Sequence, residues 1–158
     1  MRANETIKMI KYIRTNSDNE DFQLLVEQLD ADLRIRDGAD HAFYAQFNKI
    51  KNINYVIVAY QENVPVGCGA IKEYAAEIIE IKRMFVPLSK RKMGIASNIL
   101  SELEKWAKEL NFKRCILETG IKQPEAIALY KKNKYSIIPN YGQYEKVETS
   151  VCFEKIIS

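Results

Sequence analysis

The middle of the chain holds an apolar β-type run that ends in a proline and then passes through a basic loop into an amphipathic helix. The run covers residues 80–86, Pro87 ends it because proline cannot donate in a ladder, and Gly94 and Ala96 stand where the helix begins. The first turn of a helix carries backbone N–H groups without intrahelical partners, at the positive end of the helix dipole. Small residues leave room for a bulky anion to approach those groups, so this segment predicts a phosphate site.

The loop that precedes this helix is strongly basic. Lys90, Arg91 and Lys92 place mobile positive charge around the predicted phosphate site. The segment is not a Walker A loop, because it lacks the Gly-Lys-Ser/Thr ending, and its Arg-x-x-Gly-x-Ala spacing differs from the Gly-x-Gly-x-x-Gly of dinucleotide loops. A basic loop is also commonly a solvated surface, and from these residues alone both interpretations stay open.

Hydrophobic periodicity predicts a chain that mixes strands and helices. Strands are expected at residues 7–14, 55–60, 64–74, 76–86, 114–119, 135–138 and 151–157. Helices are expected from a cap at residues 17–20 to a break at 37–40, over 41–49 and 95–110, and from residue 123 onward. The predicted fold class is α/β in the mixed α+β sense, with a central mixed sheet of about seven strands flanked by about four helices.

The connections between strands predict how this sheet is assembled. The turn at residues 61–63 joins its two flanking strands into an antiparallel hairpin, and the strand at 76–86 continues the meander. A helix then leads to the strand at 114–119, and a crossover of this length favours a parallel pairing with the strand that it leaves. We therefore expect the sheet to be antiparallel on its N-terminal side and parallel at its centre.

Two blocks of the sequence resemble a known family. Residues 91–96, Arg-Lys-Met-Gly-Ile-Ala, resemble the Gln/Arg-x-x-Gly-x-Gly/Ala signature of the GCN5-related N-acetyltransferases (GNAT), which bind the pyrophosphate of acetyl-CoA on that loop. Residues 126–130, Ala-Ile-Ala-Leu-Tyr, followed by Asn-Lys-Tyr at 133–135, resemble the family's Ala-Ile-x-Leu-Tyr-x-x-x-Gly-Phe segment. The resemblance covers roughly residues 55–135 well, and it implies the GNAT fold.

The resemblance also implies which residues hold acetyl-CoA. The pantetheine arm would pair with the main chain at the end of the central strand, as peptides do when they extend a sheet. The pyrophosphate would meet backbone N–H groups of the loop, with a serine hydroxyl beside them. The residues that the resemblance assigns to the cofactor are Met84, Phe85, Val86, Arg91, Lys92, Met93, Gly94, Ile95, Ala96, Ser97 and Gln123. Gln123 departs from the pattern, since an Asn often makes this contact.

Acyl transfer to an amine also needs a base for the amine and an acid for the departing thiolate. Tyr130 matches the family's tyrosine in the Leu-Tyr pair, which implies the general acid; its alternative role is to pack its helix against the sheet. Glu80 stands in an otherwise apolar strand and precedes Arg91 by eleven residues, which resembles the base position of histone-acetylating members. Alternatively, Glu80 forms an ion pair with Lys82 or Arg83 and has a structural role. In that case a chain of water molecules would take the proton of the amine.

The residues around the acceptor are less defined. Arg34 and Arg36 could grip a carboxylate or phosphate of the acceptor, or could be the solvated end of a helix. The loop with Tyr141, Gln143 and Tyr144 could form a wall of the acceptor pocket. His41 is the only histidine, and it is not assigned a catalytic role because a lone histidine on a helix more often packs or faces solvent.

A second departure from the family's pattern concerns the backbone. Lys134 stands where the family has a glycine after the tyrosine-bearing helix. The chain must reverse direction there without the conformational freedom of glycine. We expect Asn133 to take the left-handed conformation instead.

Length and composition bound the remaining expectations. The 158 residues suggest one domain over 1–158, and a net charge of +3 with interspersed acids argues against a nucleic-acid partner. The sequence has no membrane-length apolar run and no signal-peptide core, so we expect a cytoplasmic protein with no membrane partner. Three widely spaced cysteines, without a nearby histidine, suggest buried thiols and no metal. An exposed β edge near the C-terminus could support a homodimer.

These inferences combine into a functional hypothesis. The chain is expected to be an acetyl-CoA-dependent N-acetyltransferase that moves an acetyl group to a primary amine of a small molecule or peptide, by direct transfer in a ternary complex. One alternative is a non-catalytic acyl-CoA sensor or regulatory module that keeps the cofactor cleft. A protein that binds another phosphate ligand, such as a nucleotide, is a third hypothesis.

Overall fold

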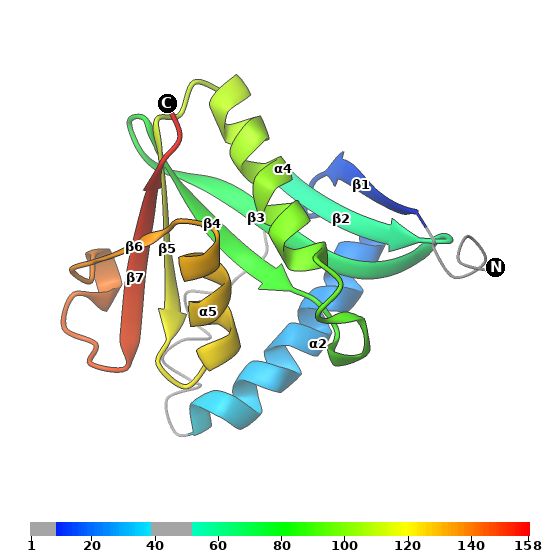
Figure 1. Cartoon of the computed structure of the whole chain (residues 1–158), viewed down its shortest axis with the longest axis horizontal. Helices are drawn as coiled ribbons and strands as arrows, with labels where there is room; N and C mark the ends of the chain where they lie inside the picture. The colour runs from blue at the N-terminus through cyan, green and yellow to red at the C-terminus, as the bar shows by residue number, and fades with distance from the viewer. Residues whose placement is uncertain (1–8, 39–51) are drawn as a thin grey trace.

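A seven-stranded sheet forms the centre of the computed structural model, which describes residues 9–38 and 52–158 (Figure 1). The strands are β1 (Ile10–Thr15), β2 (Tyr55–Gln61), β3 (Val64–Ala75), β4 (Ile78–Phe85), β5 (Arg114–Gly120), β6 (Ser136–Ile138) and β7 (Ser150–Ile156). Their spatial order is β1-β2-β3-β4-β5-β7-β6. The pair β4 and β5 is parallel and the other neighbouring pairs are antiparallel, which confirms the predicted mixed sheet.

Three α-helices cover the sheet within the described residues. They are α2 (Glu20–Asp37), α4 (Ile95–Glu109) and α5 (Pro124–Lys132), and two short 3₁₀ turns, η2 (Leu88–Lys90) and η3 (Gly142–Tyr144), complete the elements. We expected about four helices, and the helix predicted at residues 41–49 lies outside the described part of the chain. No helix among the described residues is both long enough and apolar enough to cross a membrane.

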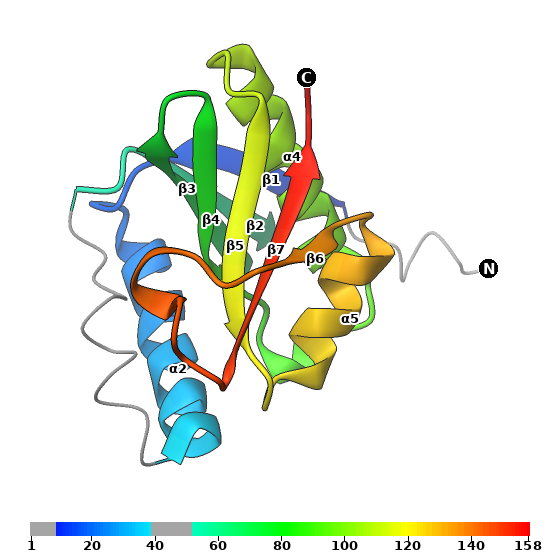
Figure 2. The ribbon, with the colours of Figure 1, turned by 90° about the vertical axis from the view of Figure 1, so that its left-hand side faces the viewer.

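The helices lie on opposite faces of the sheet. Helix α2 covers one face, and α4 and α5 cover the other, as the edge-on view in Figure 2 shows. Phe22 and Leu25 of α2 are buried against Val56 of β2, while Ile99 and Leu103 of α4 are buried in the core on the opposite face. These are the apolar positions that recur at helical spacing in the sequence, so the two-sided core follows from the periodicity.

The ends of α2 follow the signals in the sequence. The side chain of Asn19 caps the helix by accepting a hydrogen bond from the Phe22 backbone N–H at 2.8 Å. Gly38 ends the helix with a φ of 56°, a left-handed conformation that glycine adopts without strain. The cap predicted at residues 17–20 and the break predicted at 37–40 are therefore confirmed.

The three cysteines are buried and unpaired by disulfides. Burial raises the pKa of the Cys68 thiol to about 12 and that of Cys152 to about 11, so both stay protonated near neutral pH. This confirms the prediction of buried thiols.

The reversal after α5 differs from the prediction. Asn133 has a φ of −92°, so the expectation that it takes the left-handed conformation is wrong, and Lys134 adopts that conformation with a φ of 72°. The backbone of Asn133 keeps a negative φ because its side-chain amide donates a hydrogen bond to the Leu129 carbonyl at 2.9 Å.

We expect Lys134→Gly to stabilise the protein by about 1 kcal/mol, because glycine lacks the Cβ that makes the left-handed conformation costly. The free energy of unfolding in denaturant measures this effect. Lys131→Gly is the matched control: Lys131 lies inside α5, where glycine should instead destabilise by about 1 kcal/mol. Equal destabilisation by both variants would contradict the strain assigned to Lys134.

Candidate active site

The sheet opens between β4 and β5. The parallel ladder runs from Ile78–Arg114 to Glu80–Ile116 and stops there, although β4 continues to Phe85 and β5 to Gly120. The two strands therefore separate toward their carboxyl ends, and a pocket lies in the gap. Such carboxyl-terminal gaps in parallel strands are common ligand sites.

A β-bulge in β4 lies beside this gap. Cys68 opposes Phe85 and Ala70 opposes Lys82, so two residues of β4 face one residue of β3. Arg83, one of the two, has a left-handed φ of 58°. Its guanidinium is buried and donates to Asp30 of α2 at 2.5 Å, which ties the bulge to the helix. Bulges bend the strand that carries them, which accounts for the departure of β4 from β5.

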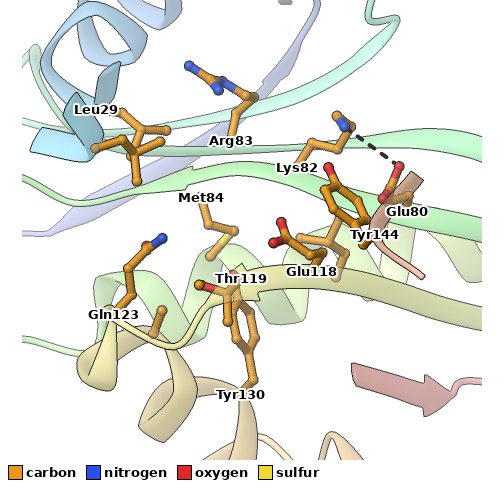
Figure 3. Close-up of a pocket in the computed structure, with 14 residues that line it drawn as sticks. Leu29, Glu80, Lys82, Arg83, Met84, Glu118, Thr119, Gln123, Tyr130 and Tyr144 are labelled. Carbon is orange, nitrogen blue, oxygen red and sulfur yellow. Dashed lines mark ion pairs between the residues drawn. The ribbon is translucent and has the colours of Figure 1, made fainter. Parts of the chain in front are cut away.

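One side of the pocket faces α2. Successive side chains of a strand point to opposite faces, and Ile79 and Ile81 of β4 belong to the core beneath α4. Glu80 and Lys82 therefore face the α2 side, as does Glu118, whose neighbour Leu117 is in that same core. The side chains that line the pocket on the α2 side include Glu80, Lys82, Glu118 and Tyr144 (Figure 3).

The other side of the pocket faces α4 and α5. Met84 and Tyr130 pack in the core beneath these helices, and Gln123 stands at the N-cap of α5. The side chains that line the pocket on this side include Met84, Thr119, Gln123 and Tyr130 (Figure 3). Predicted residues from the central strand and from the second sequence block thus meet in one pocket, because β4, β5 and α5 converge at the gap. Residues 91–96 of the first block are not among the residues that line it.

Tyr130 both packs and lines the pocket. It is only 6% exposed, and its ring lies 5.8 Å from the rings of Tyr135 and Phe153. Burial, together with the nearby carboxylate of Glu118, raises the pKa of Tyr130 above its ordinary value. The phenol therefore stays protonated at neutral pH, which a general acid requires. The two roles considered for Tyr130 are compatible with one position.

Glu80 is held by two partners. The Tyr141 hydroxyl donates to Glu80 Oε2 at 2.6 Å, and Lys82 Nζ lies 3.6 Å from Oε1. Burial, followed by the effect of Glu80, raises the pKa of Tyr141, so this phenol remains a donor. The ion pair with Lys82 that was considered as an alternative is present, and Glu80 nevertheless lines the pocket.

Glu118 and Thr119 are pocket residues that the sequence analysis missed. Ser150 Oγ of β7 donates to Glu118 Oε2 at 2.7 Å, and this contact orients the carboxylate. The signal was present, because Glu118 follows the apolar run Cys-Ile-Leu in a predicted strand, as Glu80 does in its own strand. The pocket consequently contains two carboxylates, each oriented by a hydroxyl donor.

The loop before α4 has an open helix N-terminus. Gly94 is the N-cap of α4 with a φ of 78°, and no side chain caps the helix among the described residues. A Cβ built at Gly94 would meet nothing within 4 Å, so the space beside this turn is open. The exposed N–H groups and the open approach fit a phosphate group.

Arg91 has a defined position at the base of this loop. Its Nε donates to the Val86 carbonyl at 2.7 Å, and its guanidinium lies 6.0 Å from the ring of Phe85. The side chain therefore folds back on the end of β4. Lys92 and Met93 are exposed. Ile95 is the first residue of α4, and its side chain is buried in the core.

The residues considered for the acceptor are only partly at the pocket. Tyr144 lines the pocket. Tyr141 does not line it, but its hydroxyl donates a hydrogen bond to the pocket residue Glu80. Arg36 instead pairs with Glu125 of α5 and with Asp32 of its own helix. Arg34 and Gln143 are exposed, and His41 lies outside the described residues.

This geometry can be compared with known proteins. Residues 18–135 match the model of the Acetyltransferase (GNAT) family. The chain belongs to this family. The matched segment includes Glu80, Gly94 and Tyr130, so the GNAT relationship covers the loop before α4 and every pocket residue except Tyr144.

Individual relatives agree with this assignment. An IAA acetyltransferase of Azospirillum brasilense is 34% identical over 100 residues, which are 63% of this chain and 65% of that protein. The match thus spans just under two thirds of the length of this curated relative.

Two solved structures share the fold. A Klebsiella pneumoniae protein assigned as an acyl-CoA N-acyltransferase has a TM-score of 0.80 at 24% identity, over 95% of this chain and 99% of its own. The PaiA N-acetyltransferase of Thermoplasma acidophilum, solved with coenzyme A, has a TM-score of 0.71 at 17% identity, over 94% and 99%. At these identities the two structures establish a shared fold.

Proposed function

We propose that this GNAT protein is an N-acetyltransferase that moves the acetyl group of acetyl-CoA to a primary amine of a small molecule or peptide. The observation that carries the proposal is the gap between β4 and β5, which brings a protonated tyrosine and two carboxylates into one pocket. Acetyl-CoA would enter from the side of α4, where the open helix N-terminus lies. The acceptor would enter from the α2 side, so that both substrates meet in the gap.

The end of β4 supplies the surface for the pantetheine arm. Beyond Glu80 the edge of β4 that faces β5 leaves the parallel ladder, so its main-chain groups can pair with an extended ligand. Met84 and Phe85 form this end of the strand, and Val86 follows it. The pyrophosphate would then lie against the backbone N–H groups that follow Gly94, with Ser97 beside them.

The chemistry needs one proton removed and one supplied. The amine nitrogen attacks the thioester carbonyl carbon, the new N–C bond forms, and the C–S bond breaks. Tyr130 donates its proton to the departing thiolate, and Glu80 takes the proton of the amine directly or through a water molecule. Because the phenol stays protonated over the neutral range, it is available as the donor in each turnover.

Replacing the two carboxylates separately tests the assignment of the base. We expect Glu80→Gln to lower kcat/KM about a hundredfold, because the amide cannot accept the proton. Glu118→Gln is the matched variant in the same pocket and should keep kcat/KM within about threefold of the wild-type value. If Glu118→Gln causes the large loss and Glu80→Gln does not, the base is Glu118.

Turnover across a panel of amines tests the function itself. Release of free thiol from acetyl-CoA in the presence of at least one amine is the expected result. Tight acetyl-CoA binding by calorimetry without turnover across the panel would favour the acyl-CoA sensor. A melting temperature that rises with ATP and not with CoA would contradict both and favour a nucleotide-binding protein.

A further inference from the structure

A side-chain contact links the helix that carries Tyr130 to the loop proposed to bind the pyrophosphate. Asn133, the C-cap of α5, donates from Nδ2 to Ser97 Oγ in the first turn of α4 at 3.1 Å. The same Nδ2 donates to the Leu129 carbonyl at 2.9 Å. Asn133 and Ser97 are partly buried and 36 residues apart in the sequence, so the contact forms only in the folded protein.

The orientation of the Asn133 amide follows from its partners. If the amide were turned over, its oxygen would face the Leu129 carbonyl, and two acceptors would be in contact. The nitrogen therefore points toward both Leu129 and Ser97. A serine hydroxyl has one proton to donate and two lone pairs to accept with. Because the Asn133 amide fills an acceptor position of Ser97, the hydroxyl proton is left to point elsewhere.

We propose that Asn133 is a positioning residue that turns the Ser97 hydroxyl into a donor for the pyrophosphate of acetyl-CoA. The inference rests on the proposed function, and it concerns a residue that does not itself touch the substrate. Ser97 lies three residues after Gly94, in the turn whose backbone N–H groups are open. A hydroxyl donor at this position would add a charge-assisted hydrogen bond to the phosphate oxygens.

Two acetyl donors separate this role from a merely structural one. Acetyl-CoA carries the pyrophosphate, whereas S-acetyl-N-acetylcysteamine carries the thioester without it. We expect Asn133→Ala to raise the KM for acetyl-CoA about tenfold, the effect of losing one hydrogen bond to a charged group, and to change kcat less than twofold. With S-acetyl-N-acetylcysteamine, kcat/KM should change less than twofold. The control is Lys132→Ala, because Lys132 is an exposed residue of the same turn. This variant should leave kcat and KM unchanged with both acetyl donors.

A double-mutant cycle tests whether Asn133 acts through Ser97. Ser97→Ala should raise the KM for acetyl-CoA by a similar factor, and adding Asn133→Ala to it should cause little further loss, since the two residues form one unit. Fully additive losses, or equal losses with both acetyl donors, would overturn the proposal. If Asn133→Ala does not fold, Asn133→Asp keeps the shape of the side chain but removes the donor, and it should show the same donor-dependent loss.

The wild-type protein distinguishes failure of this inference from failure of the proposed function. Suppose that the wild-type protein turns over acetyl-CoA and that Asn133→Ala leaves the KM for acetyl-CoA unchanged. This result contradicts only the role of Asn133 and leaves the proposed function standing. Wild-type protein that uses neither acetyl donor contradicts the proposed function, and the role of Asn133 fails with it.

Discussion

Tyr130→Phe is expected to lower kcat between about a hundredfold and a thousandfold, while the Kd for CoA changes less than twofold. The variant removes only the phenolic hydroxyl group, which carries the proton, and general acid catalysis contributes about this much to a rate. The ring remains, so its contacts with Tyr135 and Phe153 persist and the pocket should keep its shape. Steady-state kinetics with acetyl-CoA and calorimetry with CoA measure the two effects separately.

The matched control removes the hydroxyl of a buried tyrosine that does not line the pocket. Tyr135 packs against the Tyr130 ring, and its hydroxyl donates to Glu104 at 2.8 Å, away from the gap. Tyr135→Phe should destabilise the fold by about 1 kcal/mol through loss of this hydrogen bond and leave kcat unchanged. If both variants keep the full rate, Tyr130 is not the acid and its role is packing.

The pH dependence adds a second test of Tyr130. Since burial and Glu118 raise the pKa of this phenol, it loses its proton only at a pH above the ordinary range for tyrosine. The wild-type rate should therefore show no alkaline loss attributable to Tyr130 below about pH 10. A falling limb near pH 8 that disappears in Tyr130→Phe would contradict the assigned environment.

Gly94→Glu is expected to weaken CoA binding about a hundredfold or more. The φ of 78° at this position strains any residue with a Cβ, and the new carboxylate would enter the open space where the pyrophosphate is proposed to lie. Two negative groups would then compete for one positive helix terminus. Calorimetric titration with CoA measures the effect.

Gly94→Asn is the control for backbone strain. Asparagine tolerates the left-handed conformation better than other residues and carries no charge, so this variant should bind CoA far more tightly than Gly94→Glu. The built Cβ meets no atom within 4 Å, so neither substitution is obstructed at the Cβ itself. A Gly94→Glu protein that binds CoA as the wild type does would show that the phosphates lie elsewhere.

Much of the fold was predictable because its signals are local. The Asn19 cap, the Gly38 break and the apolar stripe of α4 each depend on residues within one or two helical turns. The parallel pairing of β4 with β5 followed from the length of the crossover between them. The predicted strands and the reversal of pairing direction at the centre are confirmed by the sheet.

The site was predictable in its positions but not in its contacts. Glu80 was recognised because burying a carboxylate in an apolar strand is costly unless it has a partner or a function. Glu118 was missed, although the same reasoning applies to its strand. The bond between Tyr141 and Glu80 joins residues 61 positions apart, and no local pattern reveals such a partner. Arg36 likewise was considered for the acceptor, but tertiary packing pairs it with Glu125.

The backbone after α5 shows how a side chain can override a simple expectation. Asparagine is the usual alternative to glycine in the left-handed conformation, so Asn133 was the reasonable choice from sequence. In the structure its amide donates hydrogen bonds to Ser97 Oγ and to the Leu129 carbonyl, which holds Asn133 at the C-cap of α5 with a negative φ. The left-handed position consequently falls to Lys134.

A crystal structure of the wild-type protein with CoA is the most direct test of where the substrate binds. We predict that the pyrophosphate oxygens accept hydrogen bonds from the backbone N–H groups that follow Gly94, and that the thiol reaches the Tyr130 hydroxyl through the gap between β4 and β5. Electron density for CoA that lies outside this gap, or that places the pyrophosphate away from the first turn of α4, would contradict the proposed function.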